Sequence, residues 1–152
     1  SGDIAESPWI RELGLDPILS LDGAFDSFTT ALLARNVPLK ALLLDQGFAA
    51  GVGNWMADDI LLMARLHPET VASALSDKQV AALFDAILRL SREAVDCKLS
   101  GQEYPRAWLF HVRPEATRGK KTFKTLTGKG VAVLKVGGRT SLYVPSLQKK
   151  SK

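Results

Sequence analysis

The sequence predicts a mainly α-helical fold that ends in a small C-terminal antiparallel β-hairpin. Before residue 113, apolar residues recur at close to 3.6-residue spacing in several segments, and capping and turn residues separate these segments. After residue 130, two runs of β-prone residues flank Gly137-Gly138, which is a hairpin signal. The hydrophobic period therefore changes from that of a helix to that of a strand near the C-terminal end.

The composition is typical of one soluble globular domain with a single core. The chain has 152 residues, of which 46% are hydrophobic and 24% are charged. No apolar run approaches the ~20 residues that span a bilayer, and no signal peptide opens the chain. The single cysteine, Cys97, excludes an internal disulfide and a zinc site built on several thiolates. We expect Cys97 to be buried or idle, and we expect no metal and no cofactor.

The first 34 residues predict a leader followed by a helix. Ser1-Gly2 is typical of a cloning scar, and residues 3–20 form a polar loop with a turn at LGLDP. Residues 22–34 predict a helix that is capped by Asp22 and packs one face into the core. That face carries Phe25, Phe28, Leu32 and Leu33.

Two helices then meet at a glycine corner. Residues 38–44 predict a helix that has Pro38 in its first turn and stops at Gly47. The turn Gly51-Val52-Gly53-Asn54 follows, and a second helix runs from Trp55 to the His67-Pro68 pair.

The corner has two possible meanings. Asn54 stands where a helix N-cap is expected, and Gly51 and Gly53 permit a positive φ or the close approach of another backbone. Unpaired N–H groups and the positive end of the helix dipole would then face outward and bind a phosphate. Alternatively, this is an ordinary helix hairpin whose glycines only make the corner.

The rest of the chain divides into a long helix, a link and a hairpin. Ser76 to Gln79 form a capping box that starts the helix, which we expect to end near Lys98. Residues 101–113 predict an irregular link whose aromatic residues fold back over the core. The hairpin strands lie on either side of Gly137-Gly138, and residues 122–127 predict a further short strand. The apolar stripe of the long helix comprises Val80, Leu83, Ile87, Leu90, Ala94 and Val95.

Positive charge is concentrated at the C-terminal end. From Arg113 onward, eleven Lys and Arg residues stand against Glu115 alone, so this segment carries +10 while the rest of the chain carries −6. Such segregation is expected of a segment that faces a polyanion. A solvated basic tail has the same composition, and charge alone does not decide between the two.

The corner resembles that of a known family. The stretches PLKALLLDQ, AGVGNWMADDIL and HP, within residues 38–68, closely resemble the helix–two-turn–helix element of the formamidopyrimidine-DNA glycosylase (Fpg/Nei) family of base-excision-repair enzymes. The resemblance covers nearly the whole chain, from LGLDP to YVP. It implies a leader at 1–20, a helix–two-turn–helix DNA-binding domain at 21–112, and a basic finger with its tail at 113–152.

The finger departs from the usual family pattern. Most members hold a zinc ion there through four cysteines, which this chain lacks. The hairpin itself is present as GGRTSLYVP and resembles the zincless finger of plant-type and some animal members. Arg139 matches the family's hairpin arginine, which implies that its guanidinium enters the DNA minor groove. Without the resemblance, Arg139 would be a surface arginine in a turn.

The resemblance also implies DNA contacts in the helical part. Asn54 matches the asparagine that caps the second helix and hydrogen-bonds a phosphate, and Lys40 matches a lysine or arginine that pairs with phosphate. Trp55 would offer its backbone N–H to phosphate, and Gly51 and Gly53 would let the strand come close. The alternatives are a pure cap for Asn54, a solvated helix lysine for Lys40, and a core or rim position for the indole of Trp55.

His111 lies roughly where many relatives have a tyrosine that contacts phosphate, although a hydrogen-bonded loop histidine is equally compatible. Three acidic residues invite a metal or acid–base interpretation, which we reject because no histidine or second carboxylate stands at ligand spacing. In the resemblance they belong to helix-end chemistry. They are Asp45, Asp58 and Asp59.

The family's nucleophile is an N-terminal proline followed by a glutamate. Nothing at Ser1-Gly2-Asp3 matches this start, and the nitrogen of Pro8 is an amide that cannot attack a sugar. We therefore expect this chain to be the DNA-binding half of an Fpg/Nei-type glycosylase and AP lyase and to be inactive by itself. The parent enzyme would excise damaged bases and cleave the strand by β/δ-elimination.

The expected partner is double-stranded DNA with an oxidised base or an abasic site, bound inside the cell by a monomer, with no membrane involved. Two alternatives stay open. The first is weak lyase action through a lysine amine of the basic segment. The second is a non-catalytic interaction module, because helix–two-turn–helix elements also resemble parts of a ribosomal protein and of a type II topoisomerase.

Overall fold

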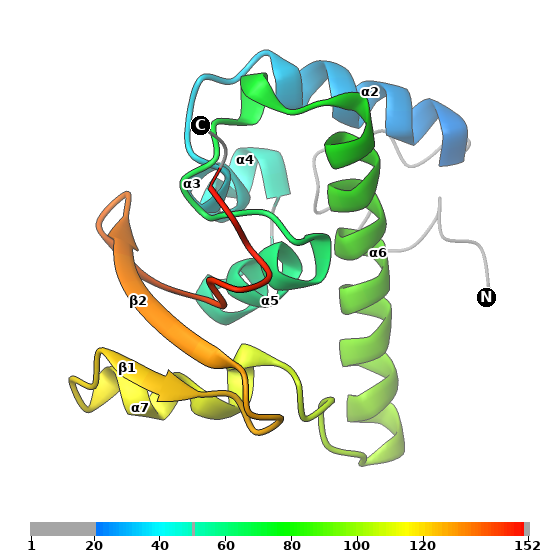
Figure 1. The fold of residues 1–152 in the computed structure, drawn as a ribbon. Helices are drawn as coiled ribbons and strands as arrows, with labels where there is room; N and C mark the ends of the chain where they lie inside the picture. Colours follow the sequence, from blue (N-terminus) through cyan, green and yellow to red (C-terminus); the bar gives the residue numbers. More distant parts are fainter. Residues whose placement is uncertain (1–20, 50, 151–152) are drawn as a thin grey trace.

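The computed structural model describes residues 21–49 and 51–150, and the expected leader at 1–20 lies outside the described residues. Helices dominate, and a three-stranded antiparallel sheet follows them at the C-terminal end, so the predicted fold class is confirmed (Figure 1). In chain order the elements are α2 (Leu21–Leu33), α3 (Leu39–Leu44), α4 (Gln46–Ala49), α5 (Asn54–Ala64), η2 (Ala72–Ala74), α6 (Asp77–Ser100), η3 (Leu109–Val112), α7 (Arg113–Thr117), β1 (Thr122–Lys124), β2 (Gly130–Val136) and β3 (Arg139–Tyr143).

Helix α6 is the longest element of the helical body, and its start follows the predicted capping box. The backbone N–H of Gln79 donates to Ser76 Oγ at 3.2 Å, and the backbone N–H of Ser76 donates to Gln79 Oε1 at 2.9 Å. The helix ends before Gly101, whose φ of 74° is left-handed. Cys97 is buried, as predicted, but Val95 at the edge of the predicted stripe is half exposed. None of the helices in the described ranges has the length and apolar character needed to cross a membrane.

Helix α2 packs against α6 through aromatic side chains. The rings of Phe28 and Phe84 have centroids 5.1 Å apart, and Phe25 meets Phe84 edge to face at 5.2 Å. Two details of the predicted helix are wrong. Asp22 is the second residue of α2 and not the residue before it, and Leu33 is exposed in the last turn.

The corner between α3 and α5 contains a short helix that was not predicted. Helix α3 ends at Leu44, as predicted, and α4 then occupies Gln46–Ala49 before the glycine turn. Pro38 is the N-cap of α3 and not its first helical residue. Helix α5 also ends early, because Arg65 takes a left-handed conformation at φ 61° and its N–H bonds back to carbonyls of the last turn.

The sheet has β2 at its centre, with β1 and β3 on either side. The predicted hairpin and the additional short strand are therefore confirmed. Gly137 and Gly138 form the two-residue connection of β2 and β3, and both have positive φ, 58° and 79°. A type I′ turn requires this combination, which glycine supplies without strain.

Two apolar clusters hold the chain together. The larger one lies among the helices, and the smaller one joins the sheet to α5 through Leu62 and to the link through Leu109. The sheet is therefore packed on the helical body along one side of α5 (Figure 1). The division of the chain into units at 21–112 and 113–152 stays a prediction.

Candidate nucleic-acid interface

The first turn of α5 is partly exposed, and the residue before it, Gly53, is exposed. Its N-cap is Gly53, in an extended conformation with φ −94° and ψ −175°, and the first intrahelical bond runs from Ala57 N to Gly53 O at 3.0 Å. Asn54 is the first helical residue and Gly53 is the N-cap, so the predicted role of Asn54 as N-cap is wrong. The N–H groups of Asn54, Trp55 and Met56 precede the first intrahelical bond and are the orphan donors of the helix.

The side chain of Asn54 has no partner of its own. Its Oδ1 is buried and accepts no hydrogen bond from any of the described residues. A buried amide oxygen without a donor is costly in a folded protein and calls for an explanation. This oxygen is an acceptor and does not bind a phosphate, so the donors that this turn offers to an anion are the orphan N–H groups and Asn54 Nδ2.

The two glycines of the corner differ in geometry. Gly51 has a φ of 89°, which favours glycine, whereas Gly53 is extended. A Cβ added at Gly53 would meet no atom within 4 Å, so the space beside this residue is empty. Gly53 therefore gives an incoming molecule close access to the start of α5.

Gln46, which was not among the predicted site residues, supports this corner from α4. Its Oε1 accepts the N–H of Gly51 at 2.9 Å, and its Nε2 donates to Val52 O at 3.2 Å. Val52 itself is buried, so the apolar core holds the turn on one side and the Gln46 amide holds it on the other. A long amide side chain just before a glycine turn was the available signal.

Arg139 is an exposed residue at the start of β3, opposite Val136. The turn that precedes it lies close to α3, because a Cβ added at Gly137 would stand 3.4 Å from the Cβ of Ala41. No ion pair holds the Arg139 guanidinium within the described part of the chain.

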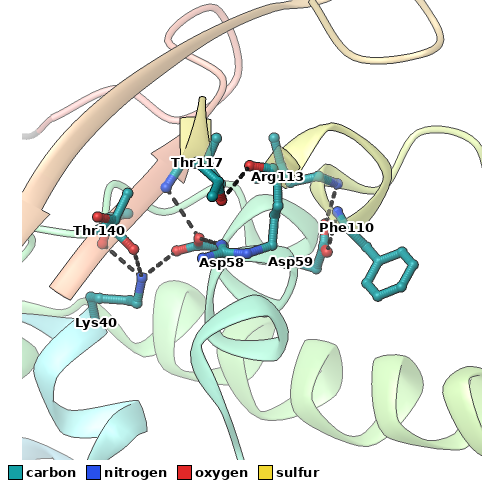
Figure 2. Close-up of polar contacts among 10 residues, drawn as sticks. Lys40, Asp58, Asp59, Phe110, Arg113, Thr117 and Thr140 are labelled. Atoms are coloured by element: carbon teal, nitrogen blue, oxygen red, sulfur yellow. Dashed lines mark hydrogen bonds and ion pairs between the residues drawn. The ribbon is translucent and has the colours of Figure 1, made fainter. Parts of the chain in front are cut away.

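Lys40 is not on the surface. Its side chain is 0% exposed, and Nζ donates to Asp58 Oδ1 at 2.6 Å, Ser141 Oγ at 2.8 Å and Thr140 O at 3.1 Å (Figure 2). These three acceptors use all three donors of the ammonium group. The predicted pairing of Lys40 with phosphate does not agree with this position, and neither does the alternative of a solvated helix lysine. Burial lowers the pKa of Lys40, and the carboxylate of Asp58 partly opposes this change.

Asp58 and Asp59 are buried side by side in the middle of α5. Asp58 Oδ2 accepts the backbone N–H of Leu142 in β3 at 3.1 Å and is also paired with Arg113. Asp59 accepts the N–H groups of Leu109 at 2.6 Å and Phe110 at 3.0 Å (Figure 2). The prediction that these residues serve helix ends is wrong for Asp58, which holds β3 against α5, whereas Asp59 does bind the first N–H groups of a helical turn, η3. Burial raises the pKa of both carboxyl groups, that of Asp59 to about 7.

The third acidic residue, Asp45, does serve a helix end. It accepts the N–H of Gly47 at 2.9 Å and forms an ion pair with Arg35 at 2.8 Å, and this hydrogen bond from Arg35 lowers the pKa of Asp45. Within the described ranges, no three His, Cys, Asp or Glu side chains stand together as metal ligands.

Trp55 belongs to an aromatic group at the start of α5. Its ring stacks on Tyr104 at 5.3 Å and meets Phe110 edge to face at 5.1 Å. Trp55 is partly buried, which agrees with the core or rim position that was the alternative for its indole. His111 hydrogen-bonds Tyr104 O through Nε2 at 2.9 Å, which agrees with a loop histidine. Trp55, Phe110 and His111 also line an open cavity of about 720 Å³ together with Arg113 and Arg118.

The elements that carry Asn54 and Arg139 are joined through side chains. Thr140, next to Arg139, contacts Lys40, and Lys40 contacts Asp58, which lies one helical turn along α5 from Asn54. The structure thus places two of the predicted site residues on neighbouring elements. Asn54 lies on α5, Arg139 lies on the hairpin, and Lys40 is buried between the two elements.

This arrangement has relatives among known proteins. The family model described as the formamidopyrimidine-DNA glycosylase H2TH domain matches residues 13–105, which is more than half of the chain. The chain belongs to the formamidopyrimidine-DNA glycosylase family. In this family member the H2TH element is the corner formed by α3, α4 and α5.

Two formamidopyrimidine-DNA glycosylases show the similarity in sequence. The formamidopyrimidine-DNA glycosylase of Arabidopsis thaliana is 40% identical over 141 residues, which are 92% of this chain and 35% of the plant protein. That of Pelotomaculum thermopropionicum is 33% identical over 147 residues, covering 92% of this chain and 52% of the relative. The chain spans about a third to about half of the length of these relatives.

Solved structures of formamidopyrimidine-DNA glycosylases share the fold. The MutM (Fpg) protein of Thermus thermophilus matches 99% of this chain and 59% of its own, with a TM-score of 0.66 and 32% identity. The Lactococcus lactis Fpg in complex with abasic-site-containing DNA matches 83% of this chain and 48% of its own, with a TM-score of 0.64 and 26% identity.

Proposed function

We propose that this chain is the DNA-binding part of a base-excision-repair glycosylase and that it grips duplex DNA at oxidised-base or abasic sites. In this proposal a longer protein that contains the chain excises the damaged base and cleaves the strand, and acts on DNA inside the cell. The single observation that carries the proposal is the first turn of α5, whose orphan N–H donors lie next to the exposed Gly53 and the empty space beside it.

Each residue of the α5 turn has a separate role. The orphan N–H groups of Asn54 and Trp55, at the positive end of the helix dipole, bind a phosphate, and the Asn54 amide adds a donor through Nδ2. Gly53 and Gly51 let the sugar–phosphate strand approach the backbone. Helix α5 has 11 residues, long enough for its dipole to act on this turn.

Arg139 supplies the second contact. Its guanidinium is exposed at the end of a tight glycine turn, where it is narrow enough to enter a minor groove and donate to base edges or phosphates. The exposed lysines of the finger add long-range attraction to the duplex. They include Lys120, Lys121, Lys124, Lys129 and Lys135.

Lys40 takes no direct part in binding in this proposal, because its donors are fully used inside the protein. The same burial argues against Lys40 as a lyase nucleophile, which needs a free and accessible amine. Borohydride reduction in the presence of abasic DNA tests lyase action. A covalent adduct that a single Lys→Ala change removes would favour the enzyme alternative.

Fluorescence anisotropy with duplex DNA, abasic duplex DNA and structured RNA tests the binding proposal. We expect the abasic duplex to bind most tightly, with affinity falling at a log–log salt slope of about −0.9 per neutralised phosphate. Asn54→Ala and Arg139→Ala should each weaken binding by about tenfold while leaving the unfolding transition in place. Wild-type affinity in both variants would remove the site assignment, and equal binding to structured RNA would favour a general interaction module.

A further inference from the structure

We propose that Lys40 and Asp58 are positioning residues: their buried ion pair sets the hairpin that bears Arg139 against the helix that bears Asn54, so that both reach one DNA duplex. This inference rests on the proposed function. Neither residue touches DNA, and each acts through the element that it holds.

The ion pair contacts β3 at three consecutive residues after Arg139. Lys40 donates to Thr140 O at 3.1 Å and Ser141 Oγ at 2.8 Å, and Asp58 accepts the N–H of Leu142 at 3.1 Å (Figure 2). Hydrogen bonds are directional, and these three fix the strand along its own axis. The position of Arg139 relative to α5 follows from them.

The apolar contacts of the sheet do not provide this register. Hydrophobic burial is non-directional, and the cluster under the sheet consists of aliphatic side chains such as Val131, Leu142 and Val144. A small ribbon is only marginally stable by itself. In the described part of the chain, the buried directional contacts between the sheet and the helical body are those of Lys40 and Asp58 and, after β3, the bond from Gln148 Nε2 to Leu66 O at 3.0 Å. The contacts of Lys40 and Asp58 are the ones directly next to Arg139 in β3.

The electrostatics of the Lys40–Asp58 pair agree with a positioning role. The side chains of Lys40 and Asp58 are both 0% exposed, and removing two charges from water costs more than an apolar pair of the same size. Such a pair is a poor means of gaining stability, whereas it is well suited to specifying one arrangement. Asp58 also neutralises a lysine that stands near enough to Arg139 for the two positive charges to repel each other.

The test is a double-variant comparison in the whole chain. Lys40→Met/Asp58→Asn replaces the ion pair by neutral side chains of similar size. The Arg113 guanidinium loses its carboxylate partner but is partly exposed and can be solvated, so the domain should stay folded. In the wild-type background Arg139→Ala should weaken binding to abasic duplex about tenfold. In the Lys40→Met/Asp58→Asn protein (the neutral background), Arg139→Ala should weaken binding to abasic duplex only about twofold, because the hairpin no longer holds Arg139 in place. Asn54→Ala should cost the same in both backgrounds.

This selective loss separates positioning from general destabilisation, which would weaken the effects of Asn54 and Arg139 together. Arg35→Ala, which breaks the exposed ion pair with Asp45, is the matched control and should leave the effect of Arg139→Ala unchanged. An unchanged effect of Arg139→Ala in the neutral background would overturn the inference.

A second variant provides the test if the double variant does not fold. Ser141→Ala removes one acceptor of Lys40 and no charge, and it should reduce the effect of Arg139→Ala while Asn54→Ala keeps its own. An undiminished Arg139 effect there would also refute positioning. Failure of the proposed function is distinguishable, because Asn54→Ala and Arg139→Ala would then have no effect even in the wild-type background.

Discussion

The carboxylate of Asp59 accepts the backbone N–H of Leu109 at 2.6 Å, although the two residues are 50 positions apart in the sequence. Through this bond and a second one to Phe110, a carboxylate inside α5 holds the start of η3 and with it the aromatic group at the α5 turn. The buried carboxyl group makes the stability of the domain sensitive to pH.

Stability should therefore decrease as the pH rises. Burial raises the pKa of Asp59 from 3.8 to about 7, so the folded protein binds a proton that the unfolded chain has already lost. The stabilisation is fully present below the unfolded pKa and disappears as the pH passes about 7. Between about pH 5 and about pH 8 the free energy of unfolding should fall by roughly 2–3 kcal/mol from this group.

Denaturant unfolding of the wild type and Asp59→Asn across this pH range checks the prediction. The variant does not titrate at this position and should lose that part of the pH dependence. The pKa of the neighbouring Asp58 is raised by burial too, and because this group is present in both proteins the comparison isolates Asp59. Parallel pH profiles of the two proteins would contradict the assignment.

Adding a methyl group at Gly53 should reduce DNA affinity without harming the fold. The backbone of Gly53 suits alanine, at φ −94°, and its Cβ would meet no atom within 4 Å. The methyl would occupy the space through which the sugar–phosphate strand approaches the α5 turn, and we expect a loss of about tenfold. Titration of abasic duplex with Gly53→Ala measures this.

Gly130→Ala is the matched control. Gly130 also has empty space at its Cβ, no positive φ and an exposed position, but it lies at the start of β2 beside Lys124. It should bind DNA like the wild type. Equal losses in Gly53→Ala and Gly130→Ala would mean that the α5 turn has no special access to the strand.

Arg139 should contribute both charge and shape. Arg139→Ala should reduce the magnitude of the log–log salt slope by about 0.9, since one phosphate contact is lost. Arg139→Lys keeps the charge without the planar fork, so it should retain the slope but lose preference for the abasic duplex. Lys78→Ala, at an exposed lysine in the first turn of α6, is the control and should change neither quantity. A salt slope unchanged in Arg139→Ala would place the phosphate contact elsewhere.

Local patterns of the sequence predicted the elements well. The capping box at Ser76 and the double-glycine turn at Gly137-Gly138 depend on residues that are neighbours in the chain, and both are present. The N-terminal boundary of α5 was missed by one residue. Asn54 is a good capping residue, but the extended Gly53 is the N-cap and Asn54 is the first helical residue.

The interior of the site was not predictable in this way. Whether Lys40 is solvated or buried depends on Asp58, 18 residues away, and on Ser141, 101 residues away. No periodicity encodes such a pairing, and a lysine in a helix is usually exposed. The signal that was present is the adjacent pair Asp58-Asp59 within an otherwise apolar helix, since two carboxylates on a buried stripe require donors from elsewhere in the fold.

Removing the Gln46 brace should weaken both the corner and DNA binding. The side chain of Gln46 is exposed, yet its amide bonds Gly51 N at 2.9 Å and Val52 O at 3.2 Å, which holds the turn before α5 in one conformation. Gln46→Ala should lower the free energy of unfolding by about 1 kcal/mol, because these bonds are partly replaced by water. Binding of abasic duplex should also weaken severalfold, because the turn must be ordered again on binding.

Gln102→Ala, at an exposed residue after α6, is the control for Gln46→Ala and should leave both quantities unchanged. Hydrogen exchange at the Gly51 amide gives an independent measurement. Its protection depends on Gln46 Oε1 and should fall in Gln46→Ala, whereas the amide of Gln79 in the capping box of α6 should keep its own protection. Loss of DNA affinity with full protection at Gly51 would show that Gln46 acts by contacting the strand and not by ordering the turn.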